Sequence, residues 1–418
     1  MNHESAPFES VLIGTGLGVY TLATALHAEY GVPSTIVTRV AIDAMRTSVA
    51  CATRELGPEA SLQDIVAELM ALGRTRAAEA YALGEEPPRM LLMCNEDGLV
   101  ELLAAHRDEL EKYYAVPIPS DAALARMVDK AEFSLLCDDL GVPTPRTEIV
   151  DFSTDAPIPA SEIAFPLVAK VARVSDLQGL DVEGYRKVYF LTSQEELDRV
   201  WAAHRRAGFR GRFVVQDLIP GDDTSMWSIT AYRDARGVVT LTACARVLLE
   251  EHTPDALGRP AAMLTMENDE LFADAEKILH ALDYRGFANF DVKHDARSGD
   301  LTFFELNPRI GRNNYYVTAA GANIARFVVS DAIQRRDIEP VTVSREVLYS
   351  LVPVSLLRRY VSDPDLWARV RAAARRGVAN PWAYGPDGLR AKAYAKAVAF
   401  NHVRKFRRYY PKPTATGF

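Results

Sequence analysis

Two neighbouring segments carry oxygen-bearing side chains at a spacing suited to metal and phosphate chemistry. Asp291 lies in the first segment, and Glu305, Asn307 and Arg309 follow at alternate positions in the second. Because side chains alternate along a strand, the last three share one face, and a hairpin would bring them beside Asp291. Carboxylate and amide oxygens suit Mg2+, and arginine stabilises a transferring phosphoryl group. The pattern predicts a Mg2+ and phosphate site, with an ordinary solvated hairpin as the alternative.

The elements that must position these residues indicate two kinds of sheet. In the first part, apolar runs alternate with helical patterns, which is typical of a parallel sheet; strands are predicted at 10–13, 35–38 and 90–94, and helices at 20–30, 61–83 and 99–113. In the second part, a helix over 121–140 ends at a Gly/Pro stop, and strand signals then come in pairs. This pairing favours antiparallel sheet, with a helix at 193–207 and strands at 166–171, 187–191, 213–216, 228–232, 238–246, 287–293 and 301–306.

Composition limits the class of protein. The chain has 418 residues, 48% apolar and 25% charged, which predicts two or three globular domains and excludes disorder. A net charge of -8 argues against a general nucleic-acid binder. Four cysteines without a CxxC pair suit a reduced compartment, so we expect a cytoplasmic protein. The apolar stretch 11–28 contains three glycines and His27, which favours strand, turn and helix over a membrane span.

The residues around Asp291 and four further segments, in the same order along the chain, resemble the ATP-grasp superfamily. The four segments are Asp129-Lys130, the stop 141–145, the strand 165–170 and the segment 214–221. The resemblance covers roughly residues 10–335 and implies an ATP-grasp architecture of mixed α/β and α+β class. The implied units are an N-terminal parallel α/β domain at 1–120, a lid subdomain at 121–225, a C-terminal antiparallel subdomain with the metal site at 226–340, and a helical basic extension at 341–418.

The resemblance implies how ATP is held. Lys130 and Lys170 would place point charges on the ATP phosphates, with a solvated surface lysine as the alternative for each. A hinge between the two lobes would offer backbone groups to the adenine edge; it is formed by Gln216, Asp217 and Ile219.

It also implies the ribose contact and the metal ligands. Asp223 matches the acidic position that takes the ribose hydroxyls, and its neighbour Asp222 is the rival. Arg309 and Lys170 would be the catalytic side chains, with Arg309 near the transferred phosphoryl group or acyl phosphate. Mg2+, or Mn2+ in its place, would be ligated by Asp291, Glu305 and Asn307.

Two glycine features depart from common patterns. The lid loop of many ATP-grasp enzymes is rich in glycine, whereas residues 171–186 contain only Gly179 and Gly184. Lys187 or Arg173 could supply charge instead, with a solvated surface residue as the equal alternative for each. The turn 14–18 follows a strand, but it lacks the G-x-G-x-x-G spacing of dinucleotide-binding proteins. We interpret it as a tight strand-to-helix turn that lies against a substrate.

The order of landmarks through 91–97, 106–110, 116–120 and 129–130 resembles the carboxylate–amine ligases of the superfamily. This implies that an amino acid such as D-aspartate is activated as an acyl phosphate for attack by an amine, as in modification of a peptidoglycan precursor, with release of ADP and phosphate. Arg246 and Arg312 are candidates to hold the acyl phosphate and a second carboxylate. The alternatives are a bicarbonate-activating enzyme of the carboxylase or carbamoyl-phosphate synthetase type, and a non-catalytic ATP-binding protein.

The C-terminal segment differs in charge from the rest of the chain. Residues 341–418 contain 15 Lys/Arg and four Asp/Glu, a local charge of +11, which leaves -19 for residues 1–340. Such a segment would attract a diphosphate-bearing precursor or an anionic membrane surface. The alternative is that its arginines pair with the acidic body of the protein. The expected partners are small-molecule substrates and not nucleic acid. A homodimer is compatible with the sequence.

Overall fold

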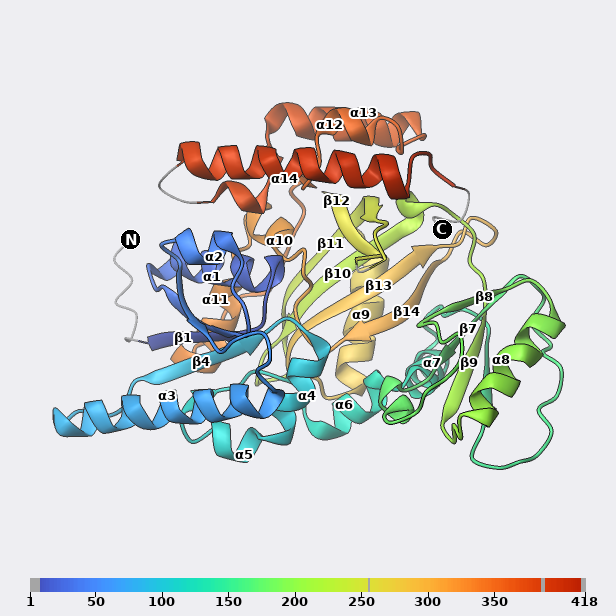
Figure 1. Ribbon diagram of the computed structural model, residues 1–418. Coiled ribbons are helices and arrows are strands. Elements are labelled where there is room, and N and C mark those ends of the chain that lie inside the picture. The colour runs from blue at the N-terminus through green and yellow to red at the C-terminus, as the bar shows by residue number, and fades with distance from the viewer. Residues whose placement is uncertain (1–7, 255, 385–387, 415–418) are drawn as a thin grey trace.

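The computed structural model describes residues 8–254, 256–384 and 388–414, and these form three sheets with helices packed around them (Figure 1). The first sheet is parallel throughout, with the strand order β3-β2-β1-β4-β5, as the alternating pattern predicts. Its strands are β1 (Phe8–Ile13), β2 (Ser34–Thr38), β3 (Cys51–Glu55), β4 (Arg89–Cys94) and β5 (Tyr114–Ala115). The edge strand β3 was not predicted, because it is largely exposed and carries no apolar run.

Helices cover both faces of this sheet. Alternation along β1 sends Leu12 into a core shared with α1 and with α11 (Ile324–Val329), whereas Val11 and Ile13 enter a second core with α3 and α4. The helices of this part are α1 (Leu17–Tyr30), α2 (Asp43–Thr47), α3 (Leu62–Ala82), α4 (Asp97–Ala105) and α5 (Arg107–Leu110). The parallel arrangement therefore gathers the loops after β1 and β4 at one edge of the sheet.

The second sheet is antiparallel and stands apart from the other two (Figure 1). Its order is β6-β9-β7-β8, and one face packs against α8 through an aromatic core in which Trp201 and Phe213 meet edge to face, with centroids 4.9 Å apart. The strands are β6 (Thr147–Asp151), β7 (Leu167–Val171), β8 (Tyr189–Leu191) and β9 (Arg212–Asp217), with the 3-10 helix η1 (Val174–Leu177) and the helix α8 (Gln194–Arg206) between them.

The helix predicted over 121–140 is two helices, α6 (Asp121–Val128) and α7 (Lys130–Leu140). The chain is extended at Asp129, whose side chain accepts hydrogen bonds from the amides of Ala131 and Glu132 and so caps α7. The same buried carboxylate lies 2.7 Å from a guanidinium nitrogen of Arg212. The break makes Lys130 the first residue of α7, and its amide donates to the carbonyl of Ala172 beside β7.

The third sheet has eight strands, in the order β14-β13-β10-β11-β12-β16-β17 with β15 added beside β11. The pairings among β10 to β14 are antiparallel, as predicted. Neither β12 nor the helix α9, which packs on the sheet, was predicted from the sequence. The elements are η2 (Asp223–Ser225), β10 (Met226–Arg233), β11 (Val239–Glu251), β12 (Arg259–Thr265), α9 (Asp269–Ala281), β13 (Gly286–His294) and β14 (Leu301–Asn307).

The basic C-terminal segment is folded onto the body of the protein. Helices α12, α13 and α14 form a layer across the third sheet and the N-terminal helices (Figure 1). Tyr410, just after α14, stacks on His252 with ring centroids 3.5 Å apart. Within the described residues, no helix is long and apolar enough to span a membrane. The last elements are α10 (Tyr315–Ala319), α11 (Ile324–Val329), η3 (Ser330–Gln334), β15 (Val341–Thr342), β16 (Leu348–Ser350), α12 (Val354–Leu357), α13 (Pro364–Arg376), β17 (Val378–Ala379), η4 (Pro381–Ala383) and α14 (Gly388–Tyr409).

We expect Asp129→Ala to lower the free energy of unfolding by about 2–3 kcal/mol, because it removes a helix cap and the buried carboxylate that pairs with the half-exposed Arg173 and Arg212. Urea unfolding of the full chain measures the loss. Asp121→Ala is the matched control, since the Asp121 side chain is exposed and, within the described residues, has Arg107 as its one ion-pair partner; it should cost less than about 1 kcal/mol. Equal losses in the two variants would contradict the assigned role of Asp129.

Candidate active site

The candidate site is built on the hairpin of β13 and β14. The two strands pair Asp291 with Glu305 and Asn289 with Asn307, so the predicted convergence of the polar side chains is confirmed. A bulge follows Asp291, between it and Val292, and changes the register beyond the site. The two carboxylates therefore lie opposite each other on one face of the sheet.

Direct contacts link the hairpin to the first sheet. The amide nitrogen of Asn307 donates to Asp291 Oδ2 at 3.1 Å, and a guanidinium nitrogen of Arg309 donates to Asn307 Oδ1 at 3.1 Å. Arg309 Nε lies 3.0 Å from Oδ1 of Asp97, the first residue of α4. Arg309 is thus held between the end of β14 and the edge of the parallel sheet.

Two lysines, one from α7 and one from β7, lie near the same hairpin. Lys130 Nζ lies 3.9 Å from Glu305 Oε1. Lys170, in β7, is buried, and its ammonium stands 5.8 Å from the centre of the Phe304 ring. Burial lowers the pKa of Lys170 to about 8, although the negative charge of Glu305 acts in the opposite direction. The structure therefore brings both predicted lysines to the predicted carboxylates.

The two carboxylates of the hairpin differ in their electrostatic surroundings. Burial acts to raise the pKa of Glu305, but Lys130, Lys170 and Lys187 outweigh it and hold the pKa below its usual value. Burial and the charge of Glu305 raise the pKa of Asp291 to about 7. At neutral pH, Glu305 is therefore ionised, whereas Asp291 is present in both its charged and its neutral form.

This set of side chains fits a divalent metal that also binds phosphate. Within the described residues, no group of three His, Cys, Asp or Glu side chains forms a complete protein cage. Mg2+ usually takes only one or two carboxylates and keeps water or phosphate oxygens, and Asp291 and Glu305 provide that number. A cation between them would also relieve their repulsion. Ligation by Asn307 would require its Oδ1 to leave Arg309.

Of the two residues expected to supplement the glycine-poor lid loop, the structure brings only one to the site. Lys187 is close enough to lower the pKa of both Lys170 and Glu305. Arg173 instead donates to the carbonyl of Ala125 at 2.7 Å and lies 3.0 Å from Asp129. Its charge is therefore directed to α6 and away from the hairpin.

The predicted hinge lies at the end of β9, between the second and third sheets. Gln216 is buried and donates to the hydroxyl of Thr147 at 3.0 Å. The amide of Asp217 already donates to the carbonyl of Arg146, while Ile219 is buried just beyond the strand. The Asp217 amide is therefore engaged within the protein, which leaves other backbone groups of this segment for a ligand.

The structure distinguishes Asp223 from its rival Asp222. Asp223 is buried, and its Oδ2 accepts from the amide of Glu250 at 2.9 Å and lies 3.0 Å from His252 Nε2. Its Oδ1 is buried without a partner among the described residues. Asp222 caps η2 by accepting from the amide and hydroxyl of Thr224. Asp223 thus retains an acceptor, whereas Asp222 is used locally.

Of the two arginines predicted to bind substrate, one lies on the other face of the sheet and one lies beside the site. Arg246 pairs with Trp227 across the sheet, while the next residue of β10, Ser228, pairs with Asp291. Adjacent residues of a strand point to opposite faces, so Arg246 does not face the carboxylates; its Nε donates to the carbonyl of Thr224. Arg312 follows Arg309 on the loop beside the site, where it contacts the buried Glu251 at 3.4 Å.

The glycine turn after β1 lies against this loop. A Cβ on Gly18 would collide with the side chain of Asn95 and come within 3.1 Å of Arg312 Cα. The amide of Thr15 donates to Glu96 at 3.3 Å. The turn therefore packs against the end of β4 and the loop after Arg309, beside the site.

Asp97 was not among the predicted site residues, and Lys187 was predicted only as one of two candidates to supply charge at the glycine-poor loop. A signal for Asp97 was present, because Asn95-Glu96-Asp97 follows a predicted parallel strand, and such strand ends commonly line a ligand site. Lys187 begins a predicted strand at 187–191, but the sequence does not show that this strand lies beside β7.

Solved structures share this fold. The biotin carboxylase domain of 2-oxoglutarate carboxylase from Hydrogenobacter thermophilus, in complex with MgADP, ADP and bicarbonate, superposes with a TM-score of 0.57 and 18% identity over 79% of this chain and 71% of that one. N5-carboxyaminoimidazole ribonucleotide synthetase from Thermus thermophilus gives 0.56 and 17% over 81% of this chain and 82% of that one. The chain therefore has the ATP-grasp fold, as the sequence predicts.

The sequence comparison gives a relative that matches nearly the whole chain. No protein-family model matches the chain. D-aspartate ligase of Enterococcus faecium is 27% identical over 422 residues, which cover 97% of this chain and 98% of that protein. The chain therefore resembles D-aspartate ligase in sequence along nearly its whole length and shares its fold with the ATP-grasp structures.

The raised pKa of Asp291 predicts how metal binding depends on pH. A metal needs the ionised carboxylate, so the affinity for Mn2+ should fall about tenfold per pH unit below pH 7 and level off above pH 8. Titration of the nucleotide-free protein with Mn2+, followed by electron paramagnetic resonance, measures this. Asp291→Asn should weaken binding and remove the pH dependence. A constant affinity between pH 6 and pH 8 in the unmodified protein would contradict the assignment.

Proposed function

We propose that the protein is an ATP- and Mg2+-dependent ligase that activates a carboxylate as an acyl phosphate for attack by an amine, with release of ADP and phosphate. The observation that carries the proposal is the convergence of Lys130 and Lys170 on the Asp291–Glu305 pair. Cations for phosphates and carboxylates for a metal are the two requirements of phosphoryl transfer. A protein that only binds nucleotide does not need this arrangement.

The residues of the site would have two roles, which are to bind ATP and to stabilise the charge that develops during phosphoryl transfer. Lys130 and Lys170 would hold the phosphates of ATP, and the nearby phosphate charge would keep Lys170 protonated despite its burial. Mg2+, when bound, would neutralise charge on the transferring phosphoryl group. Arg309, oriented by Asp97, is in place to stabilise the acyl phosphate. Mn2+ could replace Mg2+ at the same oxygen ligands.

The nucleoside would lie between the second and third sheets. Asp223 offers its unpartnered Oδ1 to a ribose hydroxyl. The hinge supports the adenine ring through Gln216, Asp217 and Ile219. We keep the division of the chain at 1–120, 121–225, 226–340 and 341–418 as a proposal for its functional units.

We propose an amino acid resembling D-aspartate as the carboxylate substrate, on the basis of the similarity to D-aspartate ligase. Arg312 is adjacent to the site and could hold a second carboxylate, provided that the substrate replaces Glu251 as its partner. The amine acceptor would be a peptidoglycan precursor in the cytoplasm. Exposed arginines of α13 and α14 would attract its diphosphate or an anionic membrane surface, and a homodimer is compatible with this arrangement.

Bicarbonate activation is the second candidate. It is favoured by the likeness in fold to the biotin carboxylase domain that was solved with bicarbonate and MgADP. The two candidates share the ATP and metal site and differ in the acceptor of the phosphoryl group.

We expect Glu305→Gln to lower the rate of ATP-dependent hydroxamate formation at least 100-fold, because it removes a metal ligand and the partner of Lys130. Trapping with hydroxylamine detects the acyl phosphate directly. Glu270→Gln is the matched control, since Glu270 is an exposed residue in the first turn of α9. Undiminished activity of Glu305→Gln, with the fold verified by circular dichroism, would remove the metal assignment.

The carboxylate can be identified with a panel that contains D-aspartate, L-aspartate, other amino acids and bicarbonate. We expect phosphate release from Mg-ATP and a hydroxamate signal with one amino acid only. Stimulation by bicarbonate alone, without hydroxamate from any amino acid, would favour the carboxylase candidate. Measurable ATP binding without product from any donor or acceptor would favour the non-catalytic alternative.

A further inference from the structure

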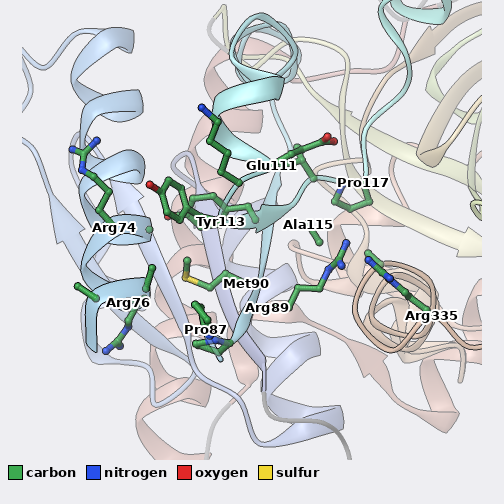
Figure 2. A pocket seen from close by; sticks show the side chains of 18 of the residues that line it. Arg74, Arg76, Pro87, Arg89, Met90, Glu111, Tyr113, Ala115, Pro117 and Arg335 are labelled. Atoms are coloured by element: carbon green, nitrogen blue, oxygen red, sulfur yellow. The ribbon is translucent and has the colours of Figure 1, made fainter. Parts of the chain in front are cut away.

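A cavity of about 850 Å3 opens at the edge of the first sheet that lies opposite the candidate active site. Three arginines from distant parts of the chain line it (Figure 2). Arg89 is the first residue of β4, Arg285 directly precedes β13, and Arg335 follows η3. Asp97, which contacts Arg309, stands beyond the other end of β4. The six residues of β4 separate the two places by roughly 20 Å.

The lining carries an excess of positive charge. Four of its cationic side chains have no ion pair within the described residues, and the lining offers them one carboxylate, Glu111; they are Arg74, Arg89, Lys112 and Arg335, while Arg285 is paired with Asp331. Arg76 also lines the cavity but is paired with Glu79. Within the described ranges of the chain, neither Arg89 nor Arg335 makes a side-chain hydrogen bond or ion pair. The excess stands out because the protein as a whole has a net charge of -8.

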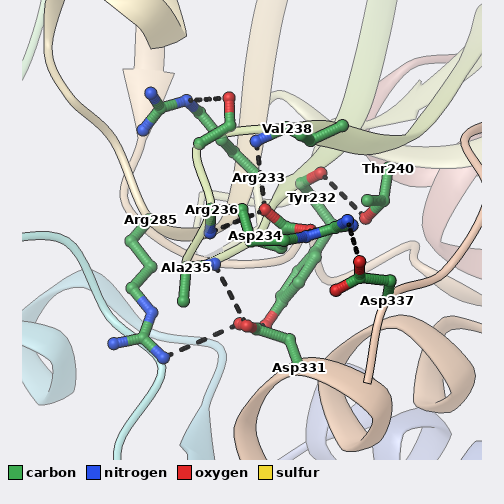
Figure 3. Close-up of polar contacts among 11 residues, drawn as sticks. Tyr232, Arg233, Asp234, Ala235, Arg236, Val238, Thr240, Arg285, Asp331 and Asp337 are labelled. Carbon is green, nitrogen blue, oxygen red and sulfur yellow. Dashed lines mark hydrogen bonds and ion pairs between the residues drawn. The ribbon is translucent and has the colours of Figure 1, made fainter. Parts of the chain in front are cut away.

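The backbone and a buried carboxylate fix two of these arginines in place. Arg335 adopts a left-handed conformation with φ of 51°, and its amide donates to the carbonyl of Ser330. Such a conformation costs about 1 kcal/mol for a residue with a side chain. Arg285 lies 3.8 Å from Asp331, which is anchored by the hydroxyl of Tyr232 at 2.8 Å and by the amide of Ala235 (Figure 3).

The arginines repel one another. Figure 2 shows the guanidinium groups of Arg89 and Arg335 directed toward each other. Arg89 is exposed to solvent, yet partial desolvation, followed by the charges of Arg335 and Arg285, lowers its pKa, and Glu111 compensates only in part. An anion in the cavity would remove this repulsion, and the cavity is large enough for a small organic ligand.

We propose that this cavity binds a small molecule that carries a diphosphate group. Guanidinium groups present pairs of donors that match phosphate oxygens, and the three arginines can neutralise the two or three charges of a diphosphate. The proposal is independent of the proposed function, because the cavity shares no residue with the Asp291–Glu305 site. It would add a second anion site to the first sheet, away from the ATP phosphates.

Calorimetric titration with pyrophosphate in the absence of metal tests this site. The full-length Lys130→Ala/Lys170→Ala variant provides the background, since it lacks the two lysines of the candidate active site. We expect one pyrophosphate per chain on this background. Adding Arg89→Ala and Arg335→Ala should weaken binding at least tenfold.

The matched control adds Arg39→Ala and Arg259→Ala instead, because these exposed arginines lie outside the cavity, carry the same charge and have no ion pair within the described residues. It should change the affinity less than twofold. Arg89→Gln alone serves as the second variant if the double change impairs folding, and it should weaken binding at least threefold. Succinate should bind at least tenfold more weakly than pyrophosphate.

Three outcomes would overturn the proposal. They are no pyrophosphate binding on the background variant, an equal loss in the cavity and control variants, and equal affinities for succinate and pyrophosphate. Each is separable from failure of the proposed function, because the titration uses neither ATP turnover nor metal.

Discussion

The arrangement of the candidate site depends on the charge balance around Glu305. This half-buried carboxylate lies near Lys130, the first residue of α7, and Lys170, the fourth residue of β7, so two elements share one negative charge. Opposite charges in such surroundings attract more strongly than in water, and removing one leaves the others unpaired. Glu305 therefore links α7 and β7 to the third sheet, while its negative charge helps to raise the pKa of Asp291 across the hairpin.

The helix break at Asp129 positions Lys130 to face Glu305. A continuous helix over 121–140 would carry Lys130 in its middle, where its direction would be set by the helix alone. The cap at Asp129 begins a new helix, and the bond from the Lys130 amide to Ala172 joins that start to the strand that bears Lys170. The two lysines thus approach the carboxylate pair from adjoining segments.

The sequence was sufficient to predict the parallel and antiparallel sheets and the pairing of Asp291 with Glu305, because alternation within one short hairpin determines the shared face. The break at Asp129 was missed, since apolar residues recur with helical spacing on both sides of it. The prediction for Arg246 was wrong for a different reason. The face of the sheet on which Arg246 lies depends on the pairing of β10 with its two neighbouring strands, which one sequence does not show. The roles of Lys130 and Lys170 came from family resemblance, because no local pattern connects two lysines forty residues apart.

The two cation clusters of the protein differ in how their charge is balanced. At the hairpin, lysines and carboxylates neutralise one another, so a ligand with a large negative charge would disturb the balance unless it brought its own cation; a complex of ATP with Mg2+ meets that condition. In the cavity beside β4, Arg89 and Arg335 have no ion pair within the described residues, and Glu111 offsets the positive charge only in part. A ligand there must provide the negative charge itself and needs no metal. Physical charge balance, rather than the number of cations, therefore separates a site for a metal–nucleotide complex from a site for a free anion.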